Sequence, residues 1–305
     1  MESLSNLSLA EDMTQNDSRD ELILVLGGTG KTGRRVADRL TRRGRSVRIG
    51  SRTGDPSFDW ADASTWDAAL AGVTAVYITY YPDVAFPEAA ARIRALTTLA
   101  VRGGARRLVL LSGRGEEGAA PAERAVRDTD AEWTILRASW FNQNFSEHFL
   151  LAPVLGGEIA LPAGEVTEPF IDVDDIAEVA VVALTESGHA GQTYELTGPR
   201  LLTFTDIAAE ITAAAGREIR YRSVSPAQYA AGAEEAGVPA EEIAGLTDLF
   251  TRVLDGRNSH TTDDVLRILG REARDFSSYA RAVAAMGVWN TGGQGVGSTR
   301  CDPDA

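Results

Sequence analysis

A glycine-rich turn between an apolar run and a helix-like stretch dominates the beginning of this sequence. The apolar run is Leu22 to Leu26, and Gly27, Gly28, Gly30 and Gly33 follow it directly. Glycine lets the backbone turn sharply and approach a phosphate group without a Cβ atom in the way, and the first amides of the next helix would face that anion. In this order of strand, glycines and helix, the spacing G-x-G-x-x-G predicts a dinucleotide site.

Two other interpretations of the glycines are weaker. Gly30, Lys31 and Thr32 resemble the end of the phosphate loop of nucleotide triphosphatases, but that motif needs glycine where Val25 stands. A turn that binds no ligand would not need so many glycines in so few residues.

Short apolar runs alternate with longer, alanine-rich stretches along most of the chain. Such alternation is typical of α/β proteins, so we expect a doubly wound parallel Rossmann sheet with a smaller C-terminal α/β lobe. Asp174 and Asp175 precede an apolar helix, Ile176 to Leu184, and are expected to cap it. The expected strands are Leu22 to Leu26, Ser46 to Gly50, a weak strand at Pro56 to Trp60, Ala75 to Thr79, Arg107 to Ser112 and Glu132 to Arg137.

The sequence suggests four segments. Residues 1–20 are polar, without the basic start and apolar stretch of a secretory signal, and are expected to form a disordered leader. Residues 21–145 should form the dinucleotide-binding Rossmann domain, with later segments able to complete part of its sheet, and 146–290 a smaller substrate lobe. Residues 291–305 are glycine-rich and are expected to be a disordered tail.

Composition excludes several kinds of partner. The net charge of −14 would repel phosphate backbones and anionic lipids, so neither nucleic acid nor a membrane is expected. The single cysteine, Cys301, can form no internal disulfide and no cysteine metal cluster, and the cytoplasm is the expected compartment. His148, His189 and His260 are isolated in the sequence, so no metal site is expected.

The end of the second expected strand predicts the choice of dinucleotide. A carboxylate there would bind the ribose diol of NAD, whereas arginine accommodates the 2′-phosphate of NADP. Ser51 and Arg52 hold this position, and Asp55 follows too late to bind the diol. The expected cofactor is NADP(H); the alternative is that Arg52 is an ordinary surface arginine. The expected cofactor-binding residues are Gly27, Thr29, Gly30, Lys31, Thr32, Gly33, Ser51, Arg52, Asp59, Thr79, Tyr80, Ser112, Phe141 and Asn144.

Five segments together resemble the NmrA-like group of atypical short-chain dehydrogenases/reductases. They are GGTGKTG, VRIGSR, the stretch from Ser112 to Gly115, LRASWFNQNF and FIDVDDIAEVA, and the likeness extends from about Glu21 to Met286. The resemblance implies an NADP site shaped by the glycine loop, by Arg52 and by the aromatic segment Trp140 to Asn144. The sequence departs from the group's LRPxxFxxN pattern at Ala138, where proline is usual.

The chain lacks the proton-transfer pair of typical short-chain dehydrogenases. Those enzymes use a tyrosine with a lysine four residues later, and Lys31 is the only lysine here. The lysine of isoflavone-reductase-like relatives is absent for the same reason. The catalytic candidates are Tyr81, Ser112 and His148. Each has an alternative role: Tyr81 as a wall of the pocket, Ser112 as a cofactor contact and His148 as a structural or exposed residue.

The leading hypothesis is NADPH-dependent reduction of a small hydrophobic carbonyl, quinone-like or conjugated substrate by a monomer or homodimer. Conjugated acceptors give stabilised anions and so need less from an acid than simple ketones do. A cluster of Tyr80, Tyr81, Trp140 and Phe141 favours this enzyme. The missing tyrosine and lysine favour a non-catalytic NADP(H)-binding redox sensor that acts through a protein partner. Isomerase or lyase chemistry with a tightly held cofactor is a third interpretation.

Overall fold

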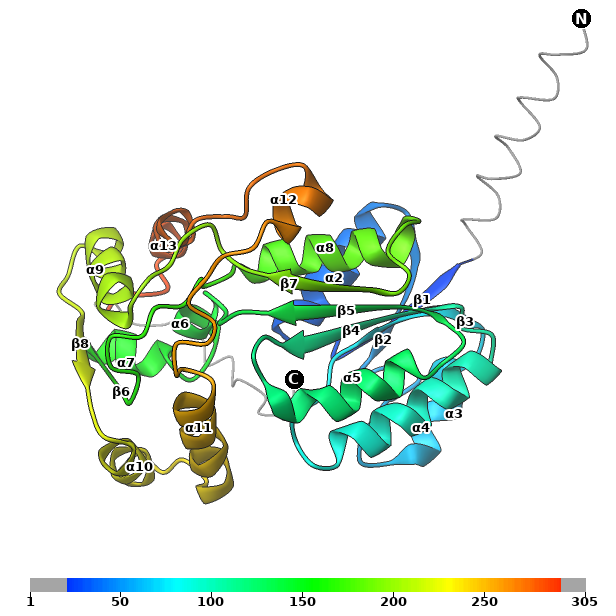
Figure 1. Ribbon diagram of the computed structural model, residues 1–305, viewed down its shortest axis with the longest axis horizontal. Helices are drawn as coiled ribbons and strands as arrows, with labels where there is room; N and C mark the ends of the chain where they lie inside the picture. Colours follow the sequence, from blue (N-terminus) through cyan, green and yellow to red (C-terminus); the bar gives the residue numbers. More distant parts are fainter. Residues whose placement is uncertain (1–20, 292–305) are drawn as a thin grey trace, which may run out of the picture.

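Six parallel strands form the main sheet in the order β2-β1-β3-β4-β5-β7 (Figure 1). The computed structural model describes residues 21–291, and the expected leader, Cys301 and the expected tail from residue 292 onward lie outside the described residues. The chain runs from β1 to β2 on one side and then crosses to β3 on the other. This reversal beside β1 is the switch point of a doubly wound sheet, so the expected fold class is confirmed. The strands are β1 (Leu22–Leu26), β2 (Ser46–Gly50), β3 (Val73–Ile78), β4 (Arg107–Gly113), β5 (Glu132–Ala138) and β7 (Gln192–Leu196).

The strand expected at Pro56 to Trp60 is wrong. The amides of Gly54 and Phe58 both donate to the carbonyl of Ser51, at 3.1 Å and 2.8 Å, so this stretch turns back on itself. Asp59 pairs only in an isolated bridge with Asp62. As a result, β2 is an edge strand of the sheet.

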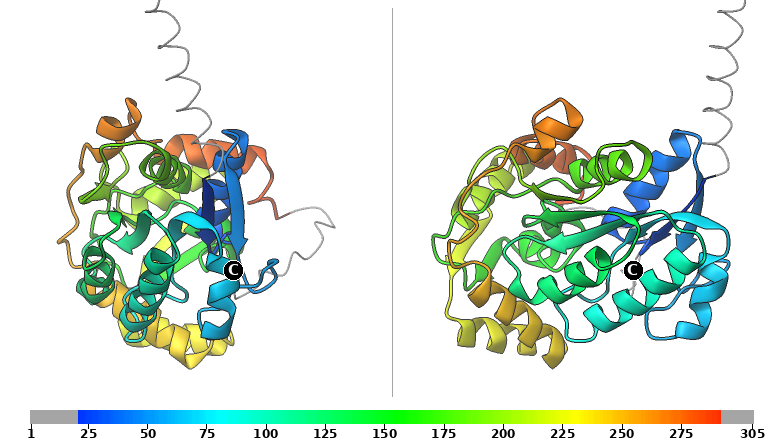
Figure 2. Two further views of the ribbon diagram at one scale, coloured as in Figure 1. Left: turned by 90° about the vertical axis from the view of Figure 1, so that its right-hand side faces the viewer. Right: turned by 45° about the vertical axis from the view of Figure 1, so that its right-hand side comes forward.

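Helices cover both faces of the sheet. On one face lie α2 (Lys31–Arg42) and α8 (Val173–Thr185); on the other lie α3 (Trp66–Leu70), α4 (Ala89–Arg102) and α5 (Ala120–Arg127). Figure 2 shows the same separation from two further directions. Along β1, Ile23 and Val25 belong to one buried core and Leu24 and Leu26 to the other. Continuous apolar strands are expected where both faces are covered.

A second lobe lies beyond the carboxyl ends of β4 and β5 (Figure 1). Its core is aromatic: the ring of Phe204 contacts those of Phe145 and Phe170, and Phe276 packs against both of the latter. The chain enters this lobe after β5, returns to the sheet for α8 and β7, and leaves again. The division at residue 145 therefore stays a prediction. The remaining elements are α6 (Asn144–Glu147), α7 (Leu151–Gly156), β6 (Glu158–Leu161), α9 (Phe204–Ala215), β8 (Arg220–Ser223), α10 (Pro226–Glu235), α11 (Ala240–Arg252), α12 (Asp264–Leu269) and α13 (Phe276–Ala285).

The helices between residues 21 and 291 are at most 14 residues long. None of them combines the length and the apolar character that a membrane crossing would require.

Candidate functional site

The glycine turn after β1 is packed too tightly for larger residues. Gly27 has a φ of +61°, and a Cβ atom on it would lie 2.3 Å from Oγ1 of Thr79. A Cβ on Gly33 would lie 2.1 Å from the carbonyl oxygen of Gly27, which is backbone and cannot move aside. The amide of Gly30 closes the turn with a 2.9 Å bond to that same carbonyl. These glycines bring the first turn of α2 against the end of β1.

The backbone amides at the beginning of α2 have no side-chain cap. Gly30 is the N-cap and provides no side-chain cap, and the first turn of the helix holds no acidic residue. The first amides of a helix lack carbonyl partners within it, and the helix dipole makes this end partly positive. The glycine turn from Gly27 to Gly33 and the first backbone amides of α2 are together called the anion cradle below. This cradle suits an anionic group, and the residues present fit the pyrophosphate of a dinucleotide.

Ser51 and Arg52 lie where β2 ends, beside the glycine turn. The amide of Gly28 donates to the carbonyl of Gly50 at 3.4 Å, which joins the turn to the last residue of β2. Ser51 is half-buried and Arg52 is exposed, and Asp55 is exposed further along the same loop. The structure therefore places a serine and an arginine next to the anion cradle.

Residues after β3 form the opposite side of the cradle. The hydroxyl of Thr79 donates to the carbonyl of Leu26 at 3.0 Å, and the indole of Trp60 donates to the carbonyl of Thr79 at 3.1 Å. The ring of Tyr80 lies 5.0 Å from that of Trp60. Tyr81 keeps half of its surface exposed.

Asp59, an expected cofactor ligand, has a local partner. Its carboxylate accepts a 2.8 Å bond from the amide of Ala61, and its carbonyl accepts one from the indole of Trp66 at 2.7 Å. These bonds shape the loop that presents Trp60.

Ser112, at the end of β4, is buried against helix α5. Its hydroxyl donates to Oε1 of Glu123 at 2.9 Å. Glu123 also accepts from Arg137 at 2.8 and 2.7 Å and from Arg127 at 3.0 Å. Burial alone would raise the pKa of Glu123, but the bonds from Arg137 and Ser112 outweigh it and lower that pKa.

The aromatic segment after β5 divides between two environments. Trp140, expected in the pocket cluster, instead lies in the core of the second lobe, where its ring stacks on Phe250 at 5.3 Å. Phe141 is half-buried and bridges to Ile171. Asn142 is fully buried, and neither the nitrogen nor the oxygen of its side-chain amide has a hydrogen-bond partner among residues 21–291. The resemblance implied that Trp140, as part of the segment Trp140 to Asn144, shapes the NADP site, but its ring packs in the core of the second lobe.

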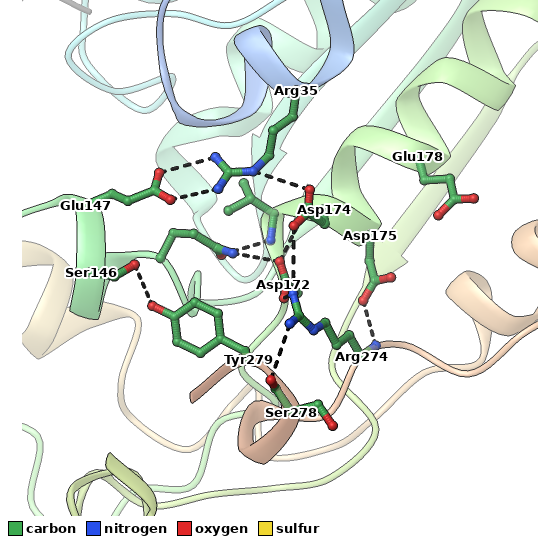
Figure 3. Close-up of polar contacts among 12 residues, drawn as sticks. Arg35, Ser146, Glu147, Asp172, Asp174, Asp175, Glu178, Arg274, Ser278 and Tyr279 are labelled. Carbon is green, nitrogen blue, oxygen red and sulfur yellow. Dashed lines mark hydrogen bonds and ion pairs between the residues drawn. The ribbon is translucent and has the colours of Figure 1, made fainter. Parts of the chain in front are cut away.

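A polar network fixes this segment to the Rossmann core (Figure 3). The side-chain amide of Gln143 donates to Asp172 at 2.6 Å and accepts from the amide of Val173 at 2.9 Å. Arg35 of α2 binds Glu147 at 2.7 Å. Asn144, which begins α6, is thereby held beside the first turns of α2.

The same network corrects the expected cap of α8. The capping residue is Asp172, whose side chain accepts from the amide of Asp174 at 2.9 Å. Asp174 instead pairs with Arg39 at 2.6 Å, and Asp175 accepts from the amide of Arg274 at 2.7 Å. Asp172 has the extended backbone that an N-cap requires, whereas Asp174 and Asp175 already lie within the helix.

His148 follows α6 and lies near Lys31 of the glycine loop. The residue as a whole is exposed, while nearby protein atoms partly desolvate the imidazole. This desolvation, together with the charge of Lys31, lowers the pKa of His148 to about 3. The imidazole is therefore uncharged at neutral pH.

Two carboxyl groups at this edge of the sheet are absent from the residues that the sequence predicted. Asp83 follows β3 and Glu116 follows β4. Burial, together with the charge of Asp83, raises the pKa of Glu116 to about 8, and burial also raises the pKa of Asp83. Their signal was present in the sequence, because polar residues just beyond neighbouring parallel strands reach the same edge.

No three of the His, Cys, Asp and Glu side chains that the structure describes are grouped so that they could hold a metal ion.

Known proteins are similar to this chain in sequence or in fold, although no protein-family model matches it. The uncharacterised oxidoreductase YesF of Bacillus subtilis (strain 168) is 36% identical over 275 residues, which cover 86% of this chain and 95% of YesF. The NAD(P)H azoreductase of Xenophilus azovorans is 31% identical over 287 residues, covering 87% and 98%. The NADPH complex of the quinone oxidoreductase QOR2 of Escherichia coli has a TM-score of 0.71 at 21% identity, covering 86% and 99%, and shares the fold.

Proposed function

This chain belongs to the NmrA-like family of atypical, NAD(P)-binding short-chain dehydrogenases/reductases, and we propose that it is an NADPH-dependent oxidoreductase of small conjugated molecules. Quinones and azo compounds are the acceptor classes that its relatives suggest. The cradle formed by Gly27, Gly33 and the first amides of α2, with Arg52 beside it, is the observation that carries this proposal.

The described residues provide candidate partners for the pyrophosphate, the 2′-phosphate and the nicotinamide ring of the cofactor. The amides at the start of α2 would hold the pyrophosphate, and Ser51 and Arg52 the 2′-phosphate. The nicotinamide ring of the cofactor, bound at the carboxyl edge of the sheet, would supply the hydride when reduced. Thr79, Tyr80, Phe141 and Asn144 come from the elements that border this edge. Tyr81 is exposed beside them and would contact the substrate.

The nature of the acceptor follows from the acids that this chain lacks. Lys31 is its only lysine and lies in the glycine loop, so no tyrosine is activated in the usual way. His148 is neutral and Ser112 is bonded to Glu123, which leaves neither as a ready acid. Conjugated acceptors spread the charge that hydride addition leaves behind and depend less on a strong donor.

We propose further that the protein works in the cytoplasm as a monomer or homodimer, without nucleic acid. The net charge of −14 supports the last point, because it would repel phosphate backbones. Light scattering of the protein at several concentrations would give its mass and decide between one and two copies.

The test is a screen for turnover. The full chain is mixed with NADPH and a panel of quinones, azo dyes and aromatic ketones, and the nicotinamide absorbance is followed. We expect consumption with at least one conjugated acceptor and a lower rate in Tyr81→Phe if the phenol bonds the substrate. Tight NADPH binding without turnover across the panel would instead favour a redox sensor that acts through a protein partner.

A further inference from the structure

Two acidic loops meet at the carboxyl edge of the sheet. β3 and β4 are parallel neighbours with Ile78 opposite Leu110, so the loops that follow them leave the sheet side by side. Asp83 belongs to the first loop and Glu116 to the second. The loops touch, since a Cβ atom on Gly118 would lie 3.0 Å from Cβ of Ala85.

The carboxyl group of Glu116 folds back over the end of β4. A Cβ atom on Gly113 would lie 2.1 Å from Cδ of Glu116 and 2.2 and 2.4 Å from its two oxygens. The carboxyl group therefore fills the space above Gly113, the residue that follows Ser112. Its Oε2 atom is buried and has no hydrogen-bond partner within the described part of the chain.

The arginines near this loop are directed elsewhere. The guanidinium of Arg114 binds Glu195 at 3.0 Å and the carbonyl of Asn258 at 2.8 Å. That of Arg257 binds Asp255, Glu117 and the carbonyl of Gly115. Asp83, whose carboxylate accepts a 2.7 Å bond from the amide of Ala85, is the charged neighbour that acts on Glu116.

This surrounding favours a protonated carboxyl group. Burial disfavours the charged form, and a second carboxyl group nearby disfavours it further. Both effects raise the pKa of Glu116, so that it retains its proton at neutral pH. An uncharged carboxylic acid at the substrate edge is the kind of donor that the missing tyrosine and lysine would otherwise provide.

We infer that Glu116 is the catalytic acid of this protein, which protonates the reduced acceptor, and that Asp83 is a positioning residue that keeps the proton on Glu116. The inference rests on the proposed function. The acceptor carbon gains the hydride and its electron pair from the reduced cofactor, and a carbonyl or quinone oxygen gains the proton as the O–H bond of Glu116 breaks. The carboxylate then takes one proton from water, so each turnover consumes one hydride and one proton.

The first test compares two neighbouring glutamates. Glu116→Gln keeps the shape of the side chain but cannot release a proton, and Glu117→Gln, on an exposed residue, is the matched control. We expect Glu116→Gln to lower kcat by about 10²- to 10⁴-fold with NADPH affinity unchanged, and Glu117→Gln to match wild type. Wild type should lose kcat as the pH rises through about 8.

Two further variants separate chemistry from structure. Asp83→Asn removes the neighbouring charge, so the pH at which kcat falls should move down. Gly113→Ala displaces the carboxyl group of Glu116 while leaving both acids present, and it should lower kcat nearly as far as Glu116→Gln. Infrared difference spectra at pH 7 should show a protonated carboxyl band in wild type and Glu117→Gln, with or without cofactor, and a weaker band in Glu116→Gln, where Glu168, whose pKa burial raises to about 7, still contributes.

The outcomes distinguish this inference from the proposed function. If wild type turns over no acceptor, the proposed function fails and the inference with it. If wild type is active and Glu116→Gln retains both its rate and its pH profile, or if Glu116→Gln leaves the protonated carboxyl band as strong as in wild type, the inference alone is overturned.

Discussion

The hydroxyl of Ser112 donates a 2.9 Å hydrogen bond to Oε1 of Glu123. Glu123 is almost completely buried and also binds Arg137 and Arg127. The serine is thus part of a structural network that ties the end of β4 to α5 and β5. Its proton already has an acceptor on the protein.

Ser112→Ala is therefore expected to act mainly on stability. Losing one buried hydrogen bond to a charged group should lower the free energy of unfolding by about 1 to 2 kcal/mol. Turnover should stay within about threefold of wild type, because a hydroxyl outside the chemistry contributes no general-acid factor. Urea unfolding and steady-state rates check both expectations. A large rate loss at unchanged stability would show that Ser112 acts on the substrate or cofactor.

Replacing either of two helical glycines by alanine should have different effects on NADPH affinity. Gly33→Ala places a Cβ atom 2.1 Å from the backbone oxygen of Gly27, so the turn must shift and NADPH affinity should fall by at least about tenfold. Gly232 lies in α10 with no atom near its added Cβ, so Gly232→Ala should bind NADPH normally. It should also gain about 0.5 to 1 kcal/mol of stability. Equal affinities for the two folded variants would exclude the cradle as the cofactor site.

The ion pair between Arg35 and Glu147 should make stability depend on pH. Burial alone would raise the pKa of Glu147, but the bonds and charges of Arg35 and Arg34 lower it below the ordinary value. A carboxyl group with a lowered folded-state pKa stabilises the protein above its unfolded-state pKa of about 4.3, and this contribution is lost as the pH falls through the folded-state pKa.

Glu147→Gln should accordingly lose about 1 to 2 kcal/mol at pH 7 relative to wild type. That difference should shrink as the pH is lowered from about 5 to 3, because wild type then loses the same charge. Chemical unfolding at several pH values measures it. A difference that stays constant down to pH 3 would mean that the carboxylate charge of Glu147 is not its source.

Local patterns predicted the sheet but not every side chain. The glycine turn and the strand before it were predictable because the apolar run and the glycine spacing are contiguous. A strand was wrongly predicted at Pro56 to Trp60, because hydrogen bonds to the carbonyl of Ser51 turn that stretch back on itself. Trp140 was misplaced because the resemblance applies to the segment Trp140 to Asn144 as a whole and does not determine which core each ring enters.

The sequence indicated only part of what brings Asp83 and Glu116 together, namely that each follows a strand of the sheet. They are 33 positions apart, and their proximity depends on β3 and β4 being neighbours in the sheet and on the carboxyl group of Glu116 folding over Gly113. Strand order was not part of the local pattern. The choice of Asp172 over Asp174 as the cap of α8 likewise depends on which residue has the extended backbone.

Arg52 should determine the preference between the two nicotinamide dinucleotides. It is exposed just beyond β2, whose last residue, Gly50, is bonded to the glycine turn. An arginine can meet the 2′-phosphate with charge-assisted bonds worth about 1.5 to 3 kcal/mol each, while NADH offers only hydroxyls there. NADPH should therefore bind about tenfold to a hundredfold more tightly than NADH, since each 1.4 kcal/mol corresponds to about a factor of ten.

Arg52→Ala should remove most of that preference by weakening NADPH alone. Arg43, exposed at the far end of α2, provides the control, and Arg43→Ala should leave both affinities unchanged. Because the net charge is −14, Arg52 also offsets a repulsive background, so the preference should decrease as salt screens its charge. Fluorescence titration with both dinucleotides at low and high salt provides the measurement. Equal tight binding of NADH and NADPH by wild type, or an Arg52→Ala variant that weakens both alike, would assign Arg52 to the ordinary protein surface.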